Sequence, residues 1–176
     1  MSFDLDEFAP SGPLPPGFYS AHDEGPFEAC SDCGSPVISP AAVHLIGKVW
    51  KESDVIFEYA LCMSCVMKLY LQYSEESKRN LAEYFAMEAP PPEDGSPHCG
   101  RCGRTGEDLT EEYSAEVLAS GSTMLGRPIR ICGACSDGAE AVLSKKTREA
   151  FDDFVRRVAP HLPEDVGIPS PVLALP

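Results

Sequence analysis

The chain has 176 residues, a formal net charge of −14 and a hydrophobic content of 43%. This length suits one domain or two small ones, and the acidic balance opposes nucleic-acid binding, which draws most of its affinity from Lys and Arg on phosphates. There is no apolar run of about 18 residues, and the acidic N-terminus lacks the basic and apolar blocks of a signal peptide. We therefore expect an intracellular, cytoplasmic protein without a membrane-spanning segment.

The first segment, 1–28, is rich in proline and carries six acidic residues but no Lys or Arg. Its beginning alternates acids with Phe3, Leu5 and Phe8, a composition suited to docking in a basic-rimmed apolar groove of a partner. A tail with little structure is the other interpretation. The C-terminal tail, 160–176, is also rich in proline, and both ends are predicted to be extended or disordered.

All eight cysteines lie in CxxC pairs, and the pairs repeat in register. Cys30 and Cys33 recur 69 positions later as Cys99 and Cys102. Cys62 and Cys65 recur 70 positions later as Cys132 and Cys135. This pattern indicates an internal duplication. Repeat 1 covers 29–88, a Pro-rich linker covers 89–98, and repeat 2 covers 99–159.

The elements of repeat 1 follow in a clear order. Two stretches rich in β-branched and aromatic residues, 41–50 and 55–62, predict a β-hairpin that delivers Cys62 at its end. Apolar residues at helical spacing then predict a helix through Tyr73, and Ser74 is expected to cap a second helix. The stripe of that second helix consists of Leu81, Tyr84 and Phe85.

Repeat 2 predicts the same layout with a weaker hairpin, from strands at 111–120 and 127–132 joined by a Gly-containing turn. A helix follows, and Ser144 is expected to cap the next one. The stripe of this last helix consists of Phe151, Phe154, Val155 and Val158. A repeat of this size has too little core to cover its stripe alone, so we expect the two repeats to pack as a pseudo-symmetric pair.

The paired cysteines predict metal sites. Tetrahedral Zn²⁺ takes four soft ligands, and a CxxC turn supplies two thiolates on one side of a metal. Glycine after Cys33 and Cys102 permits the left-handed backbone that such a knuckle tends to need. We predict two zinc ions per chain, with iron less favoured, bound by Cys30, Cys33, Cys62 and Cys65 and by Cys99, Cys102, Cys132 and Cys135. Two arrangements are compatible with this spacing: each repeat closes its own site, or the ligands are exchanged between copies in a cross-braced arrangement.

A knuckle, a hairpin and a ligand pair at a helix N-terminus resemble the treble-clef zinc fingers, over roughly 30–87 and 99–158. The resemblance implies an α+β fold of two tandem zinc-nucleated repeats, and it implies no particular function. Four thiolates leave no open coordination position for substrate, so we expect no enzyme. His44, among apolar neighbours, and His98, in the linker, are not expected to be catalytic or to bind the metal.

Binding of a protein partner, as an interaction or adaptor module, is the function that these observations favour. One alternative is a nucleic-acid-binding protein that uses the basic residues of repeat 2, and another is a zinc-thiolate redox switch. The basic residues in question are Arg101, Arg104, Arg127, Arg130, Lys145, Lys146, Arg148, Arg156 and Arg157. The simpler interpretation of these residues is a solvated surface with internal ion pairs.

Overall fold

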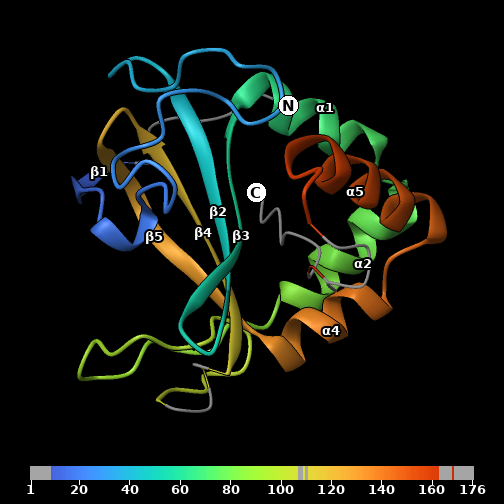
Figure 1. The fold of residues 1–176 in the computed structure, drawn as a ribbon. Helices are drawn as coiled ribbons and strands as arrows, with labels where there is room; N and C mark the ends of the chain where they lie inside the picture. Colours follow the sequence, from blue (N-terminus) through green and yellow to red (C-terminus); the bar gives the residue numbers. More distant parts are fainter. Residues whose placement is uncertain (1–8, 107–108, 110, 163–167, 169–176) are drawn as a thin grey trace.

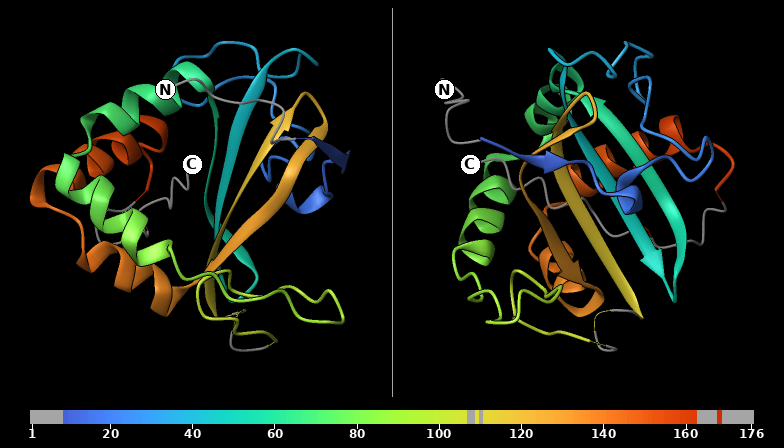
Figure 2. Two further views of the ribbon diagram at one scale, coloured as in Figure 1. Left: turned by 180° about the vertical axis from the view of Figure 1, so that it is seen from behind. Right: turned by 90° about the vertical axis from the view of Figure 1, so that its left-hand side faces the viewer.

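The computed structural model describes residues 9–106, 109, 111–162 and 168. In this part of the chain the protein has the expected α+β architecture, with a five-stranded antiparallel sheet in the order β1-β5-β4-β2-β3. Four helices cover one face of the sheet, and the N-terminal segment crosses the other face (Figures 1 and 2). Both repeats contribute strands to this one sheet.

Repeat 1 forms the predicted hairpin from β2 (Val43–Lys51) and β3 (Asp54–Cys62). The last ladder pair joins Lys51 to Asp54, so a two-residue turn connects the strands. Glu52 in this turn has a φ of 59°, in the left-handed region. The hairpin therefore ends on Cys62, as the sequence predicts.

Repeat 2 forms its hairpin from β4 (Glu112–Ser120) and β5 (Thr123–Cys132). The expected turn across 121–126 is wrong, because the strand resumes at Thr123 and only two residues form the turn. Gly126, with a φ of 70°, lies inside β5, where the register with β4 shifts between the pairs Leu118↔Leu125 and Glu116↔Ile129. A glycine at such a bulge lets the strand continue where the sequence pattern suggests a break.

The two hairpins are joined by antiparallel pairing of β2 with β4, from Val43↔Ser120 to Lys51↔Glu112. In this ladder Gly47 lies opposite Glu116, and 116 − 47 = 69, the offset that relates the first cysteine pairs of the two repeats. Equivalent positions thus face each other, which is the property of a two-fold axis. The two repeats therefore meet along equivalent strands of one antiparallel sheet.

The α-helices whose bounds lie within the described residues are α1 (Met63–Gln72), α2 (Glu75–Phe85), α4 (Gly133–Ala141) and α5 (Lys145–Val158). Both predicted caps are present. The Ser74 hydroxyl accepts a hydrogen bond from the Ser77 amide at 3.1 Å, and the Ser144 hydroxyl accepts one from the Thr147 amide at 3.3 Å. Each cap satisfies an amide that the first helical turn leaves free, and so fixes where α2 and α5 begin.

Both aromatic stripes contact the opposite repeat, with Phe151 and Phe154 of α5 buried and the stripe of α2 half-buried. Phe154 of α5 is 1% exposed and lies edge-on to Tyr59 of β3, with ring centroids 5.4 Å apart. Phe85 of α2 packs against the cluster around Cys99 and Cys132 in repeat 2. Each repeat thus covers apolar surface of the other, and a fully buried Phe is worth about 1.5 to 3 kcal/mol.

The N-terminal segment differs from its expectation, because residues 10–18 belong to the fold. β1 (Pro10–Pro13) pairs with β5, and a 3₁₀ helix, η2 (Pro16–Phe18), follows. Leu14 and Phe18 are both 2% exposed, so apolar burial orders a stretch whose composition suggests a tail. Phe3, Leu5 and Phe8 lie outside the described residues, as do 163–167 and 169–176 of the C-terminal tail.

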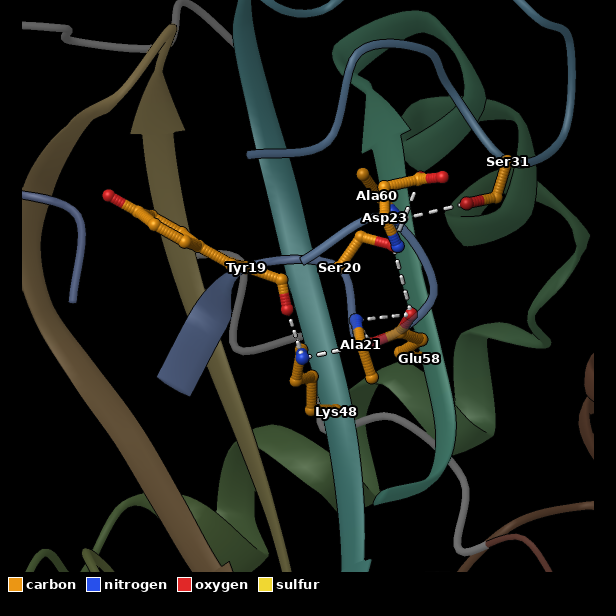
Figure 3. A network of polar contacts seen from close by, with 8 residues as sticks. All are labelled: Tyr19, Ser20, Ala21, Asp23, Ser31, Lys48, Glu58 and Ala60. Atoms are coloured by element: carbon orange, nitrogen blue, oxygen red, sulfur yellow. Dashed lines mark hydrogen bonds and ion pairs between the residues drawn. The ribbon is translucent and has the colours of Figure 1, made fainter. Parts of the chain in front are cut away.

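A buried ion pair fastens this segment across β2 and β3 (Figure 3). Lys48, 3% exposed, contacts Glu58 at 2.8 Å and also donates a hydrogen bond to the Tyr19 carbonyl. The Glu58 carboxylate in turn accepts from the Ala21 amide at 3.0 Å and from the Ser20 hydroxyl at 3.3 Å. Since every charge has a partner, the pair is compatible with burial.

Candidate metal centres

The structure gathers the eight cysteines into two groups of four, one in each repeat. Within each group the sulfur atoms all lie within 4.8 Å of one another. The first group is Cys30, Cys33, Cys62 and Cys65, and the second is Cys99, Cys102, Cys132 and Cys135. The arrangement in which each repeat closes its own site is therefore the one observed, rather than exchange between copies.

The first pair of each group lies on a tight knuckle. Gly34 and Gly103, directly after the second cysteine, have φ values of 72° and 75°, in the predicted left-handed region. Their amides donate hydrogen bonds of 2.8 Å to the carbonyls of Cys30 and Cys99. A residue with a Cβ is strained at such a φ, which explains the glycine after these two pairs.

The second pair of each group begins a helix. Cys62 is the N-cap of α1, and Cys65 lies in its first turn. Cys132 is the N-cap of α4, and Cys135 occupies the equivalent position there. The first turn of a helix has free amides and a partial positive charge, both of which stabilise a thiolate.

The sulfur spacing fits a tetrahedral metal. Cys33 and Cys62 have sulfurs 3.7 Å apart, and Cys102 and Cys132 have sulfurs 3.8 Å apart. A tetrahedron with metal–sulfur bonds of about 2.3 Å separates its sulfurs by about 3.8 Å, whereas a disulfide brings them to about 2.05 Å. All eight cysteines are free thiols.

The thiol electrostatics also favour a cation. The hydroxyl and amide of Ser35 lower the pKa of Cys33 to about 6, whereas burial and the neighbouring thiols raise the pKa of Cys65. In the second group burial of the Cys99 thiol raises its pKa. Hydrogen bonds from backbone amides, first that of Cys132, outweigh burial and bring this pKa down to about 7. Each group thus contains one thiol with a lowered pKa, while burial raises the pKa of both cysteines at its helix N-terminus, and a bound divalent cation would favour the thiolate form of these buried cysteines.

Equivalent backbone contacts hold both knuckles against their hairpins. In repeat 1 the Ser31 amide donates to the Ala60 carbonyl at 2.7 Å, and the Ser31 hydroxyl accepts from the Ala60 amide at 2.9 Å (Figure 3). In repeat 2 the Gly100 amide donates to the Arg130 carbonyl at 2.8 Å. The free edge of each hairpin therefore positions the two cysteines of its knuckle.

Both histidines named above lie outside the thiol groups. His44 is 1% exposed, and its Nδ1 lies 3.0 Å from the Ala42 carbonyl oxygen. Burial lowers its pKa, which is the environment of a neutral core histidine. His98 forms a β-bridge with Thr105 at the base of the second knuckle.

Several basic residues of repeat 2 have partners within the fold. Arg148 donates to the Leu143 carbonyl at 2.8 Å, and the Arg101 guanidinium lies 4.8 Å from the centre of the Tyr84 ring. Ion pairs join Lys145 to Glu149, Arg156 to Asp153, and Arg157 to Asp32. These contacts agree with the simpler interpretation of the basic residues, which is a solvated surface with internal ion pairs.

One buried polar residue escapes sequence reasoning. Glu116 is 8% exposed, accepts a hydrogen bond from the Tyr59 hydroxyl at 2.8 Å, and has its pKa raised by burial to about 8. Tyr59 reaches it by lying across Gly47, where a Cβ atom would be 2.1 Å from the ring. The sequence carries one signal of this contact. Glu116 is an acid within an otherwise apolar strand, and Gly47 occupies the equivalent position in the other repeat.

Comparisons with protein-family models, with curated proteins and with solved structures found no significant match to this chain. The spacing of the sulfur atoms within the two cysteine groups suggests zinc-finger-like sites. None of the helices in the described ranges is both long enough and apolar enough to cross a membrane.

Proposed function

We propose that this protein holds two structural zinc ions and acts by binding another protein. The observation that carries the metal assignment is the pair of four-thiol groups, in each of which the sulfur atoms lie within 4.8 Å of one another and one pair has the spacing that a tetrahedral ion requires. Zinc is favoured over iron because closed four-cysteine sites in small domains are its commonest structural use. Zinc would compensate the negative charge of the thiolates and would crosslink the knuckle to the hairpin and the helix.

The treble-clef likeness of each repeat supports this proposal. The knuckle, the hairpin and the helix that begins on the second cysteine pair follow in the same order in both copies. Such a unit places all four thiolates on the metal, so no coordination position is left for a substrate. Binding rather than catalysis is the function that such a closed site suits.

A protein is favoured over nucleic acid as the partner. The chain carries a net charge of −14, and many arginines of repeat 2 contact groups of the fold instead of forming an open patch. Exposed apolar side chains that suit a protein contact are present, among them Leu71 and Met87, which are 68% and 66% exposed.

Elemental analysis of carefully purified protein tests the metal assignment. We expect two zinc ions per chain, and no disulfide among the eight cysteines. A content near one or zero, or disulfides within the pairs, would contradict the assignment. Replacing zinc with cobalt adds a spectroscopic check, since four thiolates give a visible spectrum typical of a tetrahedral sulfur site.

Affinity capture tests the partner. The full chain and a chain lacking residues 1–12 are each used as bait, with and without nuclease treatment and at low and high salt. We expect bound proteins that resist nuclease and moderate salt, whereas phosphate contacts weaken steeply with salt. Recovery of nucleic acid that high salt removes would overturn the proposal in favour of nucleic-acid binding.

A thiol redox switch is the second candidate, and the exposure of Cys33 and Cys102 favours it. In such a switch two thiolates give up two electrons and form a disulfide, peroxide takes those electrons and two protons and becomes two waters, and zinc leaves. Zinc release from native protein under mild peroxide, reversed by thiol reductant and zinc, would support the switch. Retention of both ions under peroxide would exclude it.

A further inference from the structure

We propose that the two metal sites are coupled, so that an ion bound at either site raises the affinity of the other. This inference rests on the proposed function, because it concerns the same two sites. Its basis is the path of the helices. Each repeat's pair of helices begins on its own cysteines and ends against the metal site of the other repeat.

The helices of repeat 1 lead from the first site to the second. α1 begins at its N-cap Cys62, and α2 then runs to the second site, where the Tyr84 hydroxyl donates to the Cys135 carbonyl at 3.2 Å. Phe85, the last residue of α2, packs against the buried cluster that contains Cys99 and Cys132. A helix of repeat 1 therefore forms part of the wall around three cysteines of repeat 2.

The second knuckle also contacts α2. The guanidinium of Arg101, which lies between Cys99 and Cys102, is placed over the Tyr84 ring at 4.8 Å. Gly138 of α4 leaves the space that the Tyr84 hydroxyl fills, since a Cβ atom there would be 2.2 Å from that oxygen. The contact thus depends on the knuckle and on α4, the two elements that supply the cysteines of the second site.

The helices of repeat 2 lead back to the first site. α4 begins at its N-cap Cys132, and α5 ends beside the first knuckle, where Arg157 contacts Asp32 at 3.0 Å. Asp32 lies between Cys30 and Cys33, at the position equivalent to Arg101. Phe154 of α5 belongs to the same core cluster as Cys30 and Cys65.

The two helix pairs meet at a shared junction of four hydroxyl residues. The Ser74 amide donates to the Thr147 hydroxyl at 3.0 Å, and the Ser144 amide donates to the Ser77 hydroxyl at 2.8 Å. The hydroxyls of Ser74 and Ser144 lie 2.9 Å apart. Since each N-cap is bonded into the other helix, a shift of one helix pair would displace the other.

Coupling follows from this arrangement by linkage. Metal at the first site fixes the N-terminus of α1, and through the junction it holds α2 in the position that completes the second site. Loss of either ion frees a helix pair that the other site needs. Because the coupling is a free energy, each ion must change the affinity of the other by the same factor, commonly about tenfold.

Native mass spectrometry of the full-length zinc protein during stepwise removal by a chelator tests the coupling. If the sites are equal and independent, about half of the chains carry one ion at half removal, whereas a coupling of about tenfold lowers that fraction to about a quarter. Unequal independent sites raise the fraction instead. A one-ion fraction as large as that calculated for independent sites from the zinc affinities of Cys33→Ser and Cys102→Ser would overturn the coupling, and a total content of two ions would leave the proposed function intact.

Two variants test whether the helices carry the coupling. Phe85→Ala removes the contact of α2 with the second site, and Leu71→Ala is the matched control, because Leu71 is an apolar helix residue that is 68% exposed. We expect the one-ion fraction to rise toward half in Phe85→Ala alone. An equal fraction in both variants would overturn the helix route.

A third measurement does not depend on the stability of Phe85→Ala. Chelator competition gives the zinc affinity of the second site in Cys33→Ser and of the first site in Cys102→Ser. We expect both affinities to fall from the wild-type values by the same factor, about tenfold. Affinities within about twofold of wild type would overturn the coupling.

Discussion

The two metal sites share one backbone frame, but they differ in what holds the knuckle and in how deeply the sulfurs lie. In the first site Ser31 binds the hairpin edge through its amide and its hydroxyl, whereas Gly100 in the second site has only its amide. Cys132 is 1% exposed, while its counterpart Cys62 is half-buried. The main-chain contacts are thus common to both copies, and the differences lie in side chains.

The charged residues at equivalent positions of the two knuckles also differ, one being acidic and the other basic. Asp32 of the first knuckle contacts Arg157 of α5, and Arg101 of the second knuckle contacts the Tyr84 ring of α2. The two contacts join equivalent elements, although one is an ion pair and the other a cation–π contact. A duplicated fold therefore keeps the position of a contact while its chemistry changes.

The largest expected effect is the loss of a metal ligand. Cys62→Ser and Cys132→Ser should each remove one zinc ion, and structural zinc carries on the order of 10 kcal/mol, comparable with the whole stability of a domain. Cys132→Ser should be the more severe, because its hydroxyl would be buried without the metal. Elemental analysis and thermal unfolding by circular dichroism measure both effects.

The control for these two variants is Ser64→Ala, a change at an exposed position between Cys62 and Cys65. It should keep both ions and unfold at the wild-type temperature. Two ions retained in either cysteine variant would contradict the assigned ligands, and equal destabilisation of the two variants would remove the expected difference between the sites.

The next effect concerns the centre of the pseudo-symmetric pair. In Gly47→Ala the new Cβ would be 2.1 Å from the Tyr59 ring, so the ring must leave Gly47 and its bond to Glu116. We expect a loss of about 2 to 4 kcal/mol, from overpacking together with a buried carboxyl left unpaired. Urea unfolding measures it. Gly17→Ala is the control, because nothing lies within 4 Å of its Cβ position, and it should cost little.

Much of this architecture is predictable from sequence because local rules determine it. The cysteine spacing identifies both thiol groups, and the serines at 74 and 144 locate the starts of α2 and α5. The continuation of β5 through Gly126 is not predictable, because a bulge depends on the neighbouring strand. Long-range contacts are hidden for the same reason, and the burial of Glu116 under Tyr59 is the clearest case.

Glu116 makes stability depend on pH in a direction that can be tested. Its folded pKa is raised from 4.5 to about 8, so between these values the unfolded chain releases a proton that the folded chain keeps. The stabilising contribution is complete below about pH 4.5 and declines by up to about 1.4 kcal/mol per pH unit until about pH 8. Glu116→Gln cannot ionise, so it should gain stability relative to wild type over this range.

Urea unfolding of both proteins at several pH values between about 5 and 8 checks this expectation. The difference between variant and wild type is the relevant quantity, because the pH dependence of the metal sites is common to both. Gln keeps an acceptor for the Tyr59 hydroxyl, so the bond at 2.8 Å is retained. A difference that stays constant with pH would show that Glu116 is not protonated in the folded protein.

The smallest expected effect sharpens the comparison of the two knuckles. Ser31→Ala removes the hydroxyl that accepts from the Ala60 amide at 2.9 Å, and should cost about 1 kcal/mol, the typical net value of such a bond. Gly100→Ser introduces a hydroxyl at the equivalent position of the other knuckle. Its Cβ would lie 3.6 Å from the Arg130 carbonyl oxygen, an ordinary contact, and its hydroxyl would face the Arg130 amide as Ser31 faces that of Ala60.

Gly100→Ser should therefore stabilise the second knuckle by about 1 kcal/mol. Replacing glycine also reduces the entropy of the unfolded chain by about 0.4 to 1 kcal/mol, so Gly100→Ala is needed as the matched control. The excess of Ser over Ala measures the hydroxyl alone, by urea unfolding of the zinc-loaded proteins. If Ser exceeds Ala by as much as Ser31→Ala loses, the knuckles are interchangeable. If the Ser and Ala variants are equally stable, a hydroxyl at position 100 does not bind the edge of β5 as the Ser31 hydroxyl binds the edge of β3.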